Sequence, residues 1–256
     1  MKNYQEMFSL RGERALITGA TTGLGRSIAE CFVDAGAEVI VVGLEDAAIG
    51  DKVCAELGSQ THYMRFDVSA TDQADAFIKE VTRKFGEVSI LVNNAGVHCK
   101  KPLEETTDAD FRKVMDVHVM GAFALTRAVV PYMKAKRKGS ILFQTSMSAF
   151  MGAPYVIAYS CAKSGYLGMI RTLATEISKD GIRVNGIAPG WIDTPMLHQA
   201  IDGDEVRTQK ILGRTPMAKF GQSEDIGWTA VYLASPAASF INGVVLPVDG
   251  GALIGF

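Results

Sequence analysis

A tyrosine and a lysine stand four residues apart, at Tyr159 and Lys163, in a segment with helical periodicity. Residues at positions i and i+4 of a helix share one face, so the ammonium group would lie near the phenol. A positive charge there favours the phenolate and lowers a phenol pKa that starts near 10. The pair therefore predicts a general acid and base that works near neutral pH. An ordinary tyrosine and a solvated lysine on an amphipathic helix would show the same spacing.

A second candidate site is the glycine-rich turn Gly19-Ala-Thr-Thr-Gly23-Leu-Gly25, which follows an apolar run and precedes a helical segment. Glycines let the backbone curve tightly and approach a pyrophosphate, whose charge the start of a helix stabilises. Glu45 lies twenty residues beyond Gly25, where an acidic residue that binds a ribose is expected. Together these features predict a dinucleotide-binding site.

The elements that must position these residues alternate along the chain as short apolar runs and helical segments, the pattern of βα units around a buried parallel sheet. Right-handed crossovers then predict an α/β fold of the Rossmann type, with a doubly wound, parallel, seven-stranded sheet and helices on both faces. We expect a single domain over residues 1–256, with a substrate lid near 191–219. The expected strands are 15–18, 38–42, 62–66, 90–92, 140–144, 183–187 and 244–248. The expected helices are 25–34, 46–57, 71–84, 108–136, 159–179 and 223–234.

Composition argues against several classes of partner. Lysine and arginine total 26 against 28 aspartates and glutamates, a net charge of −2 that predicts neither a nucleic-acid nor an anionic-membrane partner. No apolar run approaches the ~20 residues of a membrane span, and the first residues lack the apolar stretch of a secretory signal. The four cysteines and four histidines show no metal-ligand spacing. We therefore expect no metal and a cytoplasmic protein with reduced thiols.

Four motifs, in this order and spacing, resemble the short-chain dehydrogenase/reductase family over nearly the whole chain. They are the turn at 19–25, Asn93-Asn94-Ala95-Gly96, Tyr159-Ser-Cys-Ala-Lys163 with Ser146 thirteen residues before it, and Pro189-Gly190-Trp191-Ile192-Asp193-Thr194. The resemblance implies an oxidoreductase that interconverts a secondary alcohol and a ketone by hydride transfer with NAD or NADP. It also implies a homotetramer that pairs the helices 108–136 and 159–179, although packing on the sheet alone would make their faces equally apolar.

The resemblance assigns roles to individual residues. Tyr159 would exchange a proton with the substrate oxygen, Ser146 would hydrogen-bond that oxygen, and Lys163 would also hold the nicotinamide ribose. Ser146 could instead be a strand-end hydroxyl satisfied by backbone, and Ser148 could share its role toward substrate. The family's cofactor contacts fall on Gly19, Thr22, Gly23, Leu24, Gly25, Leu44, Glu45, Asp67, Val68, Asn94, Ala95, Gly96, Tyr159, Lys163, Pro189, Gly190, Ile192 and Thr194.

The chain departs from the family at two positions. His118 stands where the family usually has an asparagine that supports a proton-relay water; a histidine could take part in the relay or be an ordinary core residue. Gly43 stands where a ribose-binding aspartate is usual, which leaves Glu45 to reach the hydroxyls. Because Thr22 and Leu44 are neutral where a cation would hold the 2′-phosphate of NADP, we expect NAD, without excluding NADP.

For the substrate, the segments FSLRG, SMSAF, GRTPMAKFG and VDGGALIGF resemble the gluconate 5-dehydrogenase and 2-dehydro-3-deoxygluconate 5-dehydrogenase branch. Lys100 and Lys101 follow the NNAG motif and could pair with a sugar-acid carboxylate, or could lie in a solvated loop. His198, Arg207 and Arg214 are weaker candidates for that contact.

Two other functions compete with this interpretation. One is a 3-oxoacyl-[acyl-carrier-protein] reductase, whose carrier-binding arginines would align with Pro131 and Thr175 here. The other is a protein that binds a dinucleotide without turnover.

Overall fold

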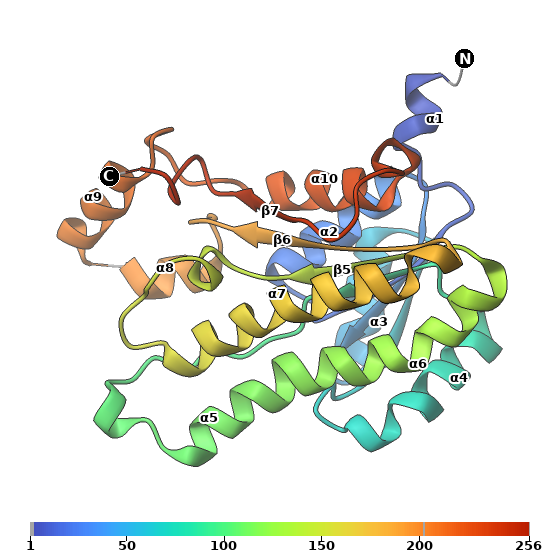
Figure 1. Ribbon diagram of the computed structural model, residues 1–256, viewed down its shortest axis with the longest axis horizontal. Coiled ribbons are helices and arrows are strands. Elements are labelled where there is room, and N and C mark those ends of the chain that lie inside the picture. Colours follow the sequence, from blue (N-terminus) through green and yellow to red (C-terminus); the bar gives the residue numbers. More distant parts are fainter. Residues whose placement is uncertain (1–2, 202, 256) are drawn as a thin grey trace.

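Seven parallel strands form one sheet in the order β3-β2-β1-β4-β5-β6-β7 in the computed structural model, which describes residues 3–201 and 203–255 (Figure 1). The strands are β1 (Arg14–Thr18), β2 (Glu38–Gly43), β3 (Thr61–Arg65), β4 (Ile90–Asn93), β5 (Gly139–Gln144), β6 (Ile182–Pro189) and β7 (Val245–Val248). The predicted strands are confirmed to within two residues at each end. The strand order reverses between β1 and β4, and a doubly wound sheet binds its ligands at the carboxyl ends of strands on either side of such a point.

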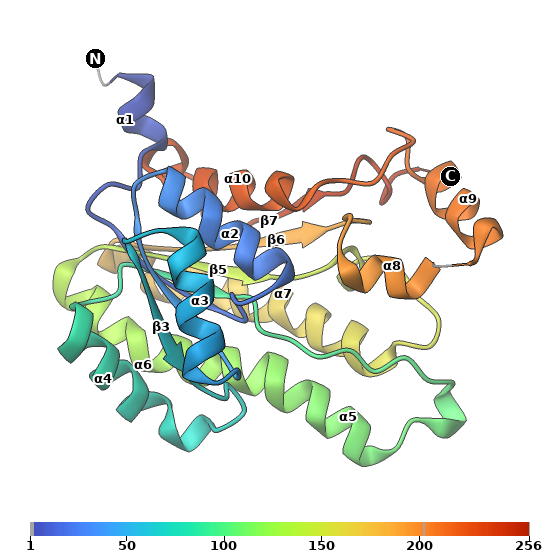
Figure 2. The ribbon, with the colours of Figure 1, turned by 180° about the vertical axis from the view of Figure 1, so that it is seen from behind.

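Helices cover both faces of the sheet, as Figures 1 and 2 show from opposite sides. One face carries α2 (Gly23–Asp34), α3 (Ala47–Leu57) and α10 (Ser223–Ala234). The other carries α4 (Ala74–Phe85), α6 (Gly121–Lys136) and α7 (Ile157–Ile177), with α5 (Asp108–Met115) leading into α6. Side chains of alternate residues in β1 enter opposite cores, with Leu16 on the α6 side and Ile17 on the α2 side. The sheet is therefore buried on both faces, which explains its nearly continuous apolar strands.

The helix expected over 108–136 is interrupted at the turn that contains His118. Residues Asp116–Met120 form one π-helical turn between α5 and α6. Such turns insert an extra residue into the helix and are frequent at functional sites. The turn leaves His118 buried, 1% exposed.

The segment 191–219 contains two helices that the sequence analysis did not predict, α8 (Pro195–Ile201) and α9 (Glu205–Arg214). Leu197, Ile201 and Ile211 form a small apolar cluster there, separate from the two main cores. A further short helix, α1 (Tyr4–Phe8), precedes the sheet. This segment is thus a small packed unit that lies beyond the carboxyl ends of the strands (Figure 1).

By length and composition, one helical stretch in the described part of the chain, Asp108–Lys136, could cross a membrane, which the sequence analysis did not anticipate. Half of its most apolar window is buried inside the fold, and Leu125 and Val129 belong to the core beneath the sheet. The core helix of a globular protein passes the same test.

Candidate functional site

The glycine-rich turn is clamped to β4 by the NNAG motif. Asn94 Nδ2 donates hydrogen bonds to the carbonyls of Thr18 and Gly19, at 2.8 and 3.0 Å. The backbone N–H groups of Asn94 and Ala95 both donate to Thr18 Oγ1 at 3.0 Å. A Cβ on Gly25 would collide with Gly19 O and Asn94 Nδ2, so only glycine fits there. The motif therefore holds the carboxyl ends of β1 and β4 together, at the point where the strand order reverses.

The helix that follows this turn has an open amino terminus. α2 begins at Gly23, whose φ of +56° favours glycine, and Gly19 has a φ of +63°. The N-cap residue Thr22 makes no side-chain hydrogen bond to the first turn of the helix. The backbone N–H groups in the first turn of α2, together with the helix dipole, suit an anion such as a pyrophosphate.

The carboxylate of Glu45 lies back over the end of β2. Its Oε1 accepts a hydrogen bond from Thr21 Oγ1 at 2.9 Å, and its backbone carbonyl accepts one from Tyr63 Oη at 2.5 Å. A Cβ on Gly43 would collide with Glu45 Oε2, which is buried and has no hydrogen-bond partner among the described residues. Glu45 thus places a carboxylate beside Gly43 at the end of β2, and these features together fit a dinucleotide.

Two further predicted segments reach the same edge of the sheet. After β3, Asp67 Oδ1 accepts hydrogen bonds from the N–H and hydroxyl of Ser69, and Val68 is buried. After β6, a Cβ on Gly190 would lie 2.6 Å from Asp249 Cα, so the chain passes very close to the end of β7. Ile192 is buried, and Thr194 Oγ1 accepts from Leu197 N at the start of α8 at 3.3 Å. Both segments therefore lie at the carboxyl ends of the strands, and the one after β6 leads into 191–219.

Tyr159 and Lys163 lie on one face of α7, as their spacing predicts. Lys163 is 3% exposed, and its Nζ donates to the backbone carbonyl of Gln144, at the end of β5, at 2.6 Å. The same Nζ lies 5.4 Å from the centre of the Tyr159 ring. Ser146 Oγ accepts from Ser148 N at 3.1 Å, and Ser148 Oγ is buried without a partner in the described part of the chain.

The predicted lowering of the Tyr159 pKa is wrong for this structure. Burial raises the pKa of Tyr159 above its ordinary value of 10, and the nearby Ser146 hydroxyl opposes that rise only in part. Burial also lowers the pKa of Lys163 to about 7, from an ordinary value of 10.5. The ammonium that was expected to stabilise the phenolate is directed at the Gln144 carbonyl and is itself costly to bury.

His118 lies beside Tyr159, with ring centres 5.6 Å apart, and its pKa is affected by the charge of Lys163. Its Nε2 lies 2.9 Å from the carbonyl oxygen of Val97 and 3.1 Å from its nitrogen, and the tautomer decides which bond forms. Burial lowers the pKa of His118 to about 3, with the Lys163 charge adding to that effect. The ring is therefore neutral at physiological pH and is held by backbone.

The structure separates the two lysines that the sequence treated together. Lys101 Nζ forms an ion pair with Asp110 Oδ2 at 2.7 Å, and the same carboxylate accepts from Thr107 in the capping box of α5. Lys101 is thus engaged in holding the start of a helix, so its expected role toward substrate is not supported. Lys100 is exposed, and its charge contributes to the lowered pKa of His98.

His98 and Tyr166 are neighbours of Tyr159 and Lys163 that the sequence analysis did not single out. The His98 ring lies 4.8 Å from that of Tyr159, and Tyr166 Oη donates to the backbone carbonyl of His118 at 2.9 Å. Tyr166 follows Lys163 by three residues, so helical spacing could have indicated that it lies on the same face.

Two of the weaker cationic candidates have other partners. His198 Nε2 lies 2.6 Å from Asp193 Oδ1, and Arg214 Nε donates to the carbonyl of Ala252 at 3.3 Å. Arg207 lies on α9. No group of three His, Cys, Asp or Glu side chains within residues 3–201 and 203–255 could hold a metal ion.

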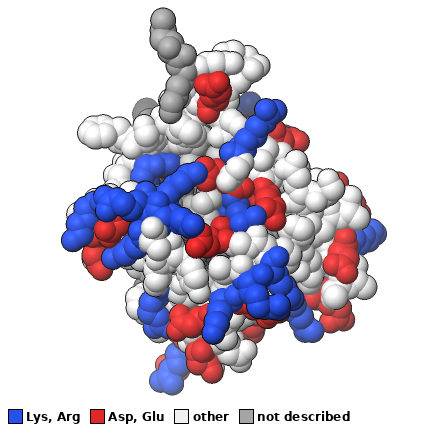
Figure 3. Space-filling view, turned by 90° about the vertical axis from the view of Figure 1, so that its right-hand side faces the viewer, with Lys and Arg blue, Asp and Glu red and all other residues white. Residues whose placement is uncertain are grey.

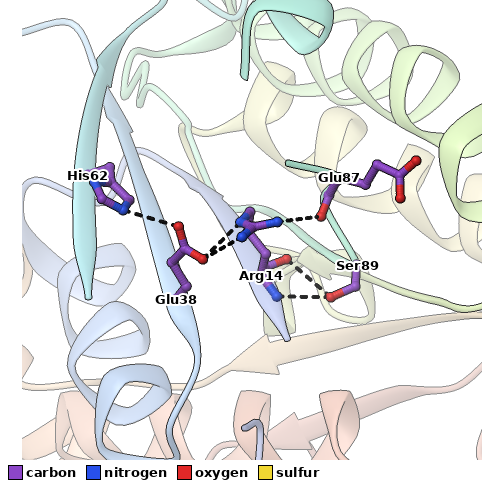
Figure 4. A network of polar contacts seen from close by, with 5 residues as sticks. All are labelled: Arg14, Glu38, His62, Glu87 and Ser89. Atoms are coloured by element: carbon purple, nitrogen blue, oxygen red, sulfur yellow. Dashed lines mark hydrogen bonds and ion pairs between the residues drawn. The ribbon is translucent and has the colours of Figure 1, made fainter. Parts of the chain in front are cut away.

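A cavity of about 270 Å³ lies at the opposite end of the sheet, at the amino ends of the strands. Figure 3 shows positive and negative side chains interspersed over this side of the molecule. Arg14 and Lys136, in its lining, pair with Glu38 at 2.6 Å and Glu87 at 3.1 Å. Figure 4 shows the network around Arg14, in which Glu38 also contacts His62 at 3.1 Å. These ion pairs stabilise the amino-terminal end of the sheet. The candidate functional site lies at the opposite, carboxyl-terminal end.

Comparison with known proteins agrees with a dinucleotide-binding site at the carboxyl ends of the strands. A family model described as Enoyl-(Acyl carrier protein) reductase matches residues 19–252. The chain is 40% identical over 249 residues, 96% of its length and 98% of the relative's, to 2-dehydro-3-deoxy-D-gluconate 5-dehydrogenase of Pseudoalteromonas atlantica. It is 34% identical over 247 residues, 96% and 99% of the two chains, to the 3-oxoacyl-[acyl-carrier-protein] reductase of Thermotoga maritima.

Among solved structures, the gluconate 5-dehydrogenase of Burkholderia cenocepacia in complex with NADP and tartrate superposes with a TM-score of 0.94 and 30% identity. The match covers 99% of this chain and all of the other.

Proposed function

Because this chain belongs to the short-chain dehydrogenase/reductase family, we propose that it interconverts a secondary alcohol and a ketone on a sugar acid, using NAD(P). The substrate is of the gluconate/5-ketogluconate or deoxy-ketogluconate type. The observation that supports the proposal is that Tyr159 and Lys163 share α7, with Lys163 Nζ on the carbonyl of Gln144 at the carboxyl end of β5, while the glycine-rich turn follows the carboxyl end of β1 in the same sheet. The 40% identity to a sugar-acid dehydrogenase over nearly the whole chain supports the substrate class.

The chain's own residues supply proton transfer and orientation. When bound, NAD(P) donates or accepts the hydride. Tyr159 exchanges a proton with the substrate oxygen, and Ser146 hydrogen-bonds the same oxygen. Lys163 places a cationic group 5.4 Å from the centre of the Tyr159 ring, where its charge favours the phenolate against the opposing effect of burial, and it also holds the nicotinamide ribose. His118 stabilises the loop at Val97 as a neutral ring, which argues against a role for its side chain as a proton carrier.

For the cofactor, the open amino terminus of α2 receives the pyrophosphate and Glu45 binds the adenine ribose. Gly19, Gly23, Gly25, Asn94, Ala95 and Gly96 shape the turn. Thr22, Leu24, Leu44, Asp67, Val68, Pro189, Gly190, Ile192 and Thr194 complete the contacts. The carboxylate of Glu45 would repel a 2′-phosphate, so we propose a preference for NAD although the Burkholderia relative was solved with NADP.

Substrate specificity rests on Lys100 and Ser148. Lys100 is near enough to His98 to affect its pKa, and His98 contacts Tyr159, so a carboxylate beside Tyr159 lies within reach of this loop. The buried, unpartnered Ser148 Oγ is a second polar contact. We propose that 191–219, with α8 and α9, closes over the substrate as a lid on this single-domain protein.

A carrier-linked 3-oxoacyl reductase is the second candidate, since the Thermotoga maritima relative is 34% identical. The residues that align with that family's carrier-binding arginines are Pro131, inside α6, and Thr175, on α7. Neither can pair with an acidic carrier, which favours the sugar acid.

We further propose a cytoplasmic homotetramer. Phe123 on α6 and Ile157 on α7 are exposed at 44% and 43%, and Leu246 on the edge strand β7 is exposed at 37%. Two apolar surfaces on different sides suit two kinds of subunit interface. Light scattering after size exclusion tests this, and a stable monomer at micromolar concentration would contradict it.

The test of the activity is absorbance of the reduced nicotinamide with NAD and NADP against gluconate, 5-ketogluconate, deoxy-ketogluconates, neutral polyols and an acetoacetyl thioester. Turnover confined to acidic sugars supports the proposal. Turnover of the thioester alone would establish the reductase, and cofactor binding without turnover would indicate a non-catalytic protein.

A further inference from the structure

A buried phenol that the proposed mechanism does not use lies next to its lysine. Tyr166 is 1% exposed and stands three residues after Lys163 on α7. Its hydroxyl donates to the backbone carbonyl of His118 at 2.9 Å, in the π-helical turn Asp116–Met120. Tyr166 therefore ties the helix that carries the catalytic pair to the turn that carries His118.

The ring of Tyr166 forms one wall of the lysine site. Lys163 Nζ lies 5.1 Å from the centre of the Tyr166 ring and 5.4 Å from that of Tyr159. A cation within about 6 Å of an aromatic face is attracted by the negative face of the ring, most strongly where water is excluded. Lys163 Nζ makes one hydrogen bond to a protein group, the Gln144 carbonyl, within the described residues. Two aromatic rings and one carbonyl thus surround a buried ammonium.

We propose that Tyr166 is a positioning residue of the active site: its ring stabilises the ammonium form of Lys163 beside Tyr159, and its hydroxyl fixes the π-helical turn. This rests on the proposed function, in which the Lys163 charge favours the Tyr159 phenolate. Burial lowers the pKa of Lys163 to about 7, so a modest loss of stabilisation would discharge it within the working pH range.

The remaining groups that face Lys163 do not supply this stabilisation. His118, from the π-helical turn, and His98, from the loop after β4, are the titratable groups from other elements whose pKa values its charge lowers. A histidine that gains a proton there would repel the ammonium, and no carboxylate contributes to the pKa of Lys163. The Tyr166 and Tyr159 rings are therefore the favourable side-chain partners of the charge.

The test varies the electrostatics of the ring while keeping its shape. Tyr166→Phe keeps the face and loses only the hydroxyl, and 3,5-difluoro- and 3,4,5-trifluorophenylalanine at position 166 progressively weaken the negative face. For Tyr166→Phe, we expect the alkaline limb of the pH profile of kcat/KM to stay at the wild-type pH. It should move stepwise to lower pH with fluorination, on the order of one pH unit for a loss of the whole cation–π interaction.

Tyr166→Leu removes the face altogether and should shift the limb furthest. Phe143→Leu is its matched control, since Phe143 is fully buried on β5 and packs on Tyr166 with ring centres 5.2 Å apart. This control should lose stability without moving the limb. An alkaline limb that is the same for Phe and for both fluorinated variants would overturn the proposal, even if Tyr166→Leu fails to fold.

A readout that does not depend on turnover separates this inference from the proposed function. The titration of Lys163 can be followed by NMR of ε-¹³C-labelled lysine, with the signal assigned by its loss in Lys163→Met. A midpoint that falls with fluorination supports the role of Tyr166 even if no sugar acid reacts. An unchanged midpoint refutes that role even if the sugar-acid activity is found.

Discussion

The carboxylate of Glu45 lies over Gly43 and fills the space that any side chain at position 43 would need. A glycine at the end of β2 thus leaves room there for a carboxylate from two residues later. The Thr21 hydroxyl holds one carboxylate oxygen at 2.9 Å, and the other oxygen has no partner among the described residues. The absence of a side chain at position 43 therefore decides where the Glu45 carboxylate lies.

Replacing Glu45 by Ala should change the choice of cofactor. The loss of charge-assisted hydrogen bonds to the ribose hydroxyls should weaken NAD binding by roughly tenfold or more. NADP should bind relatively better, because no carboxylate would face its 2′-phosphate. Fluorescence titration with both cofactors measures the two Kd values. Asp46→Asn removes a neighbouring exposed charge that pairs with Arg65, and it should leave the preference unaltered. An unchanged NAD to NADP ratio in Glu45→Ala would exclude this role.

Replacing Tyr159 by Phe should abolish most turnover and leave cofactor binding intact. Proton transfer by a positioned side chain contributes about 10²- to 10⁴-fold, and the phenol is the group that would carry it. The measurements are steady-state kcat and the Kd for cofactor. Tyr155→Phe, at an exposed residue on the loop before α7, is the control and should retain full activity. Activity retained in Tyr159→Phe would remove the central assignment.

The two neighbouring lysines should give different kinetics. Lys100→Ala should raise KM for acidic sugars by roughly tenfold and leave KM for neutral polyols unchanged, because it removes a partner for the carboxylate. Lys101→Ala should affect both substrates alike and lower the urea midpoint slightly, since Lys101 pairs with the Asp110 cap of α5. In that variant the pKa of Asp110, held at about 2 chiefly by Lys101, should rise. An acid-selective effect of Lys101→Ala, with none for Lys100→Ala, would reverse the assignment.

His118 should make the protein less stable as the pH falls. Its pKa is about 3 in the folded protein and near 6.5 when exposed, so below pH 6.5 the unfolded chain binds a proton that the folded chain excludes. Folding is then disfavoured by up to about 1.4 kcal/mol per pH unit until the pH approaches 3. Urea midpoints between pH 4 and 8 should fall less steeply with acid in His118→Asn than in the wild type. Equal slopes in His118→Asn and the wild type would contradict the prediction.

Apolar periodicity and turn chemistry in the sequence were enough to predict the sheet and its helices. The runs around Ile17 and Val41 are apolar on both faces because helices cover the sheet on both sides. The four motifs were enough to predict that the segments of the candidate site lie at the carboxyl ends of the strands. These signals are local, because each depends on residues that are neighbours along the chain.

The partner of each charged or polar side chain was decided only by the tertiary structure. The sequence could not distinguish Lys100 from Lys101, because the partner of Lys101 is Asp110, nine residues away at the start of α5. Likewise the Tyr159 pKa depends on desolvation by groups that pack around it in the fold, and Tyr166 reaches the carbonyl of His118, 48 residues earlier in the chain. Desolvation and long-range hydrogen bonds arise when distant segments pack together, so residue type and spacing alone do not determine them.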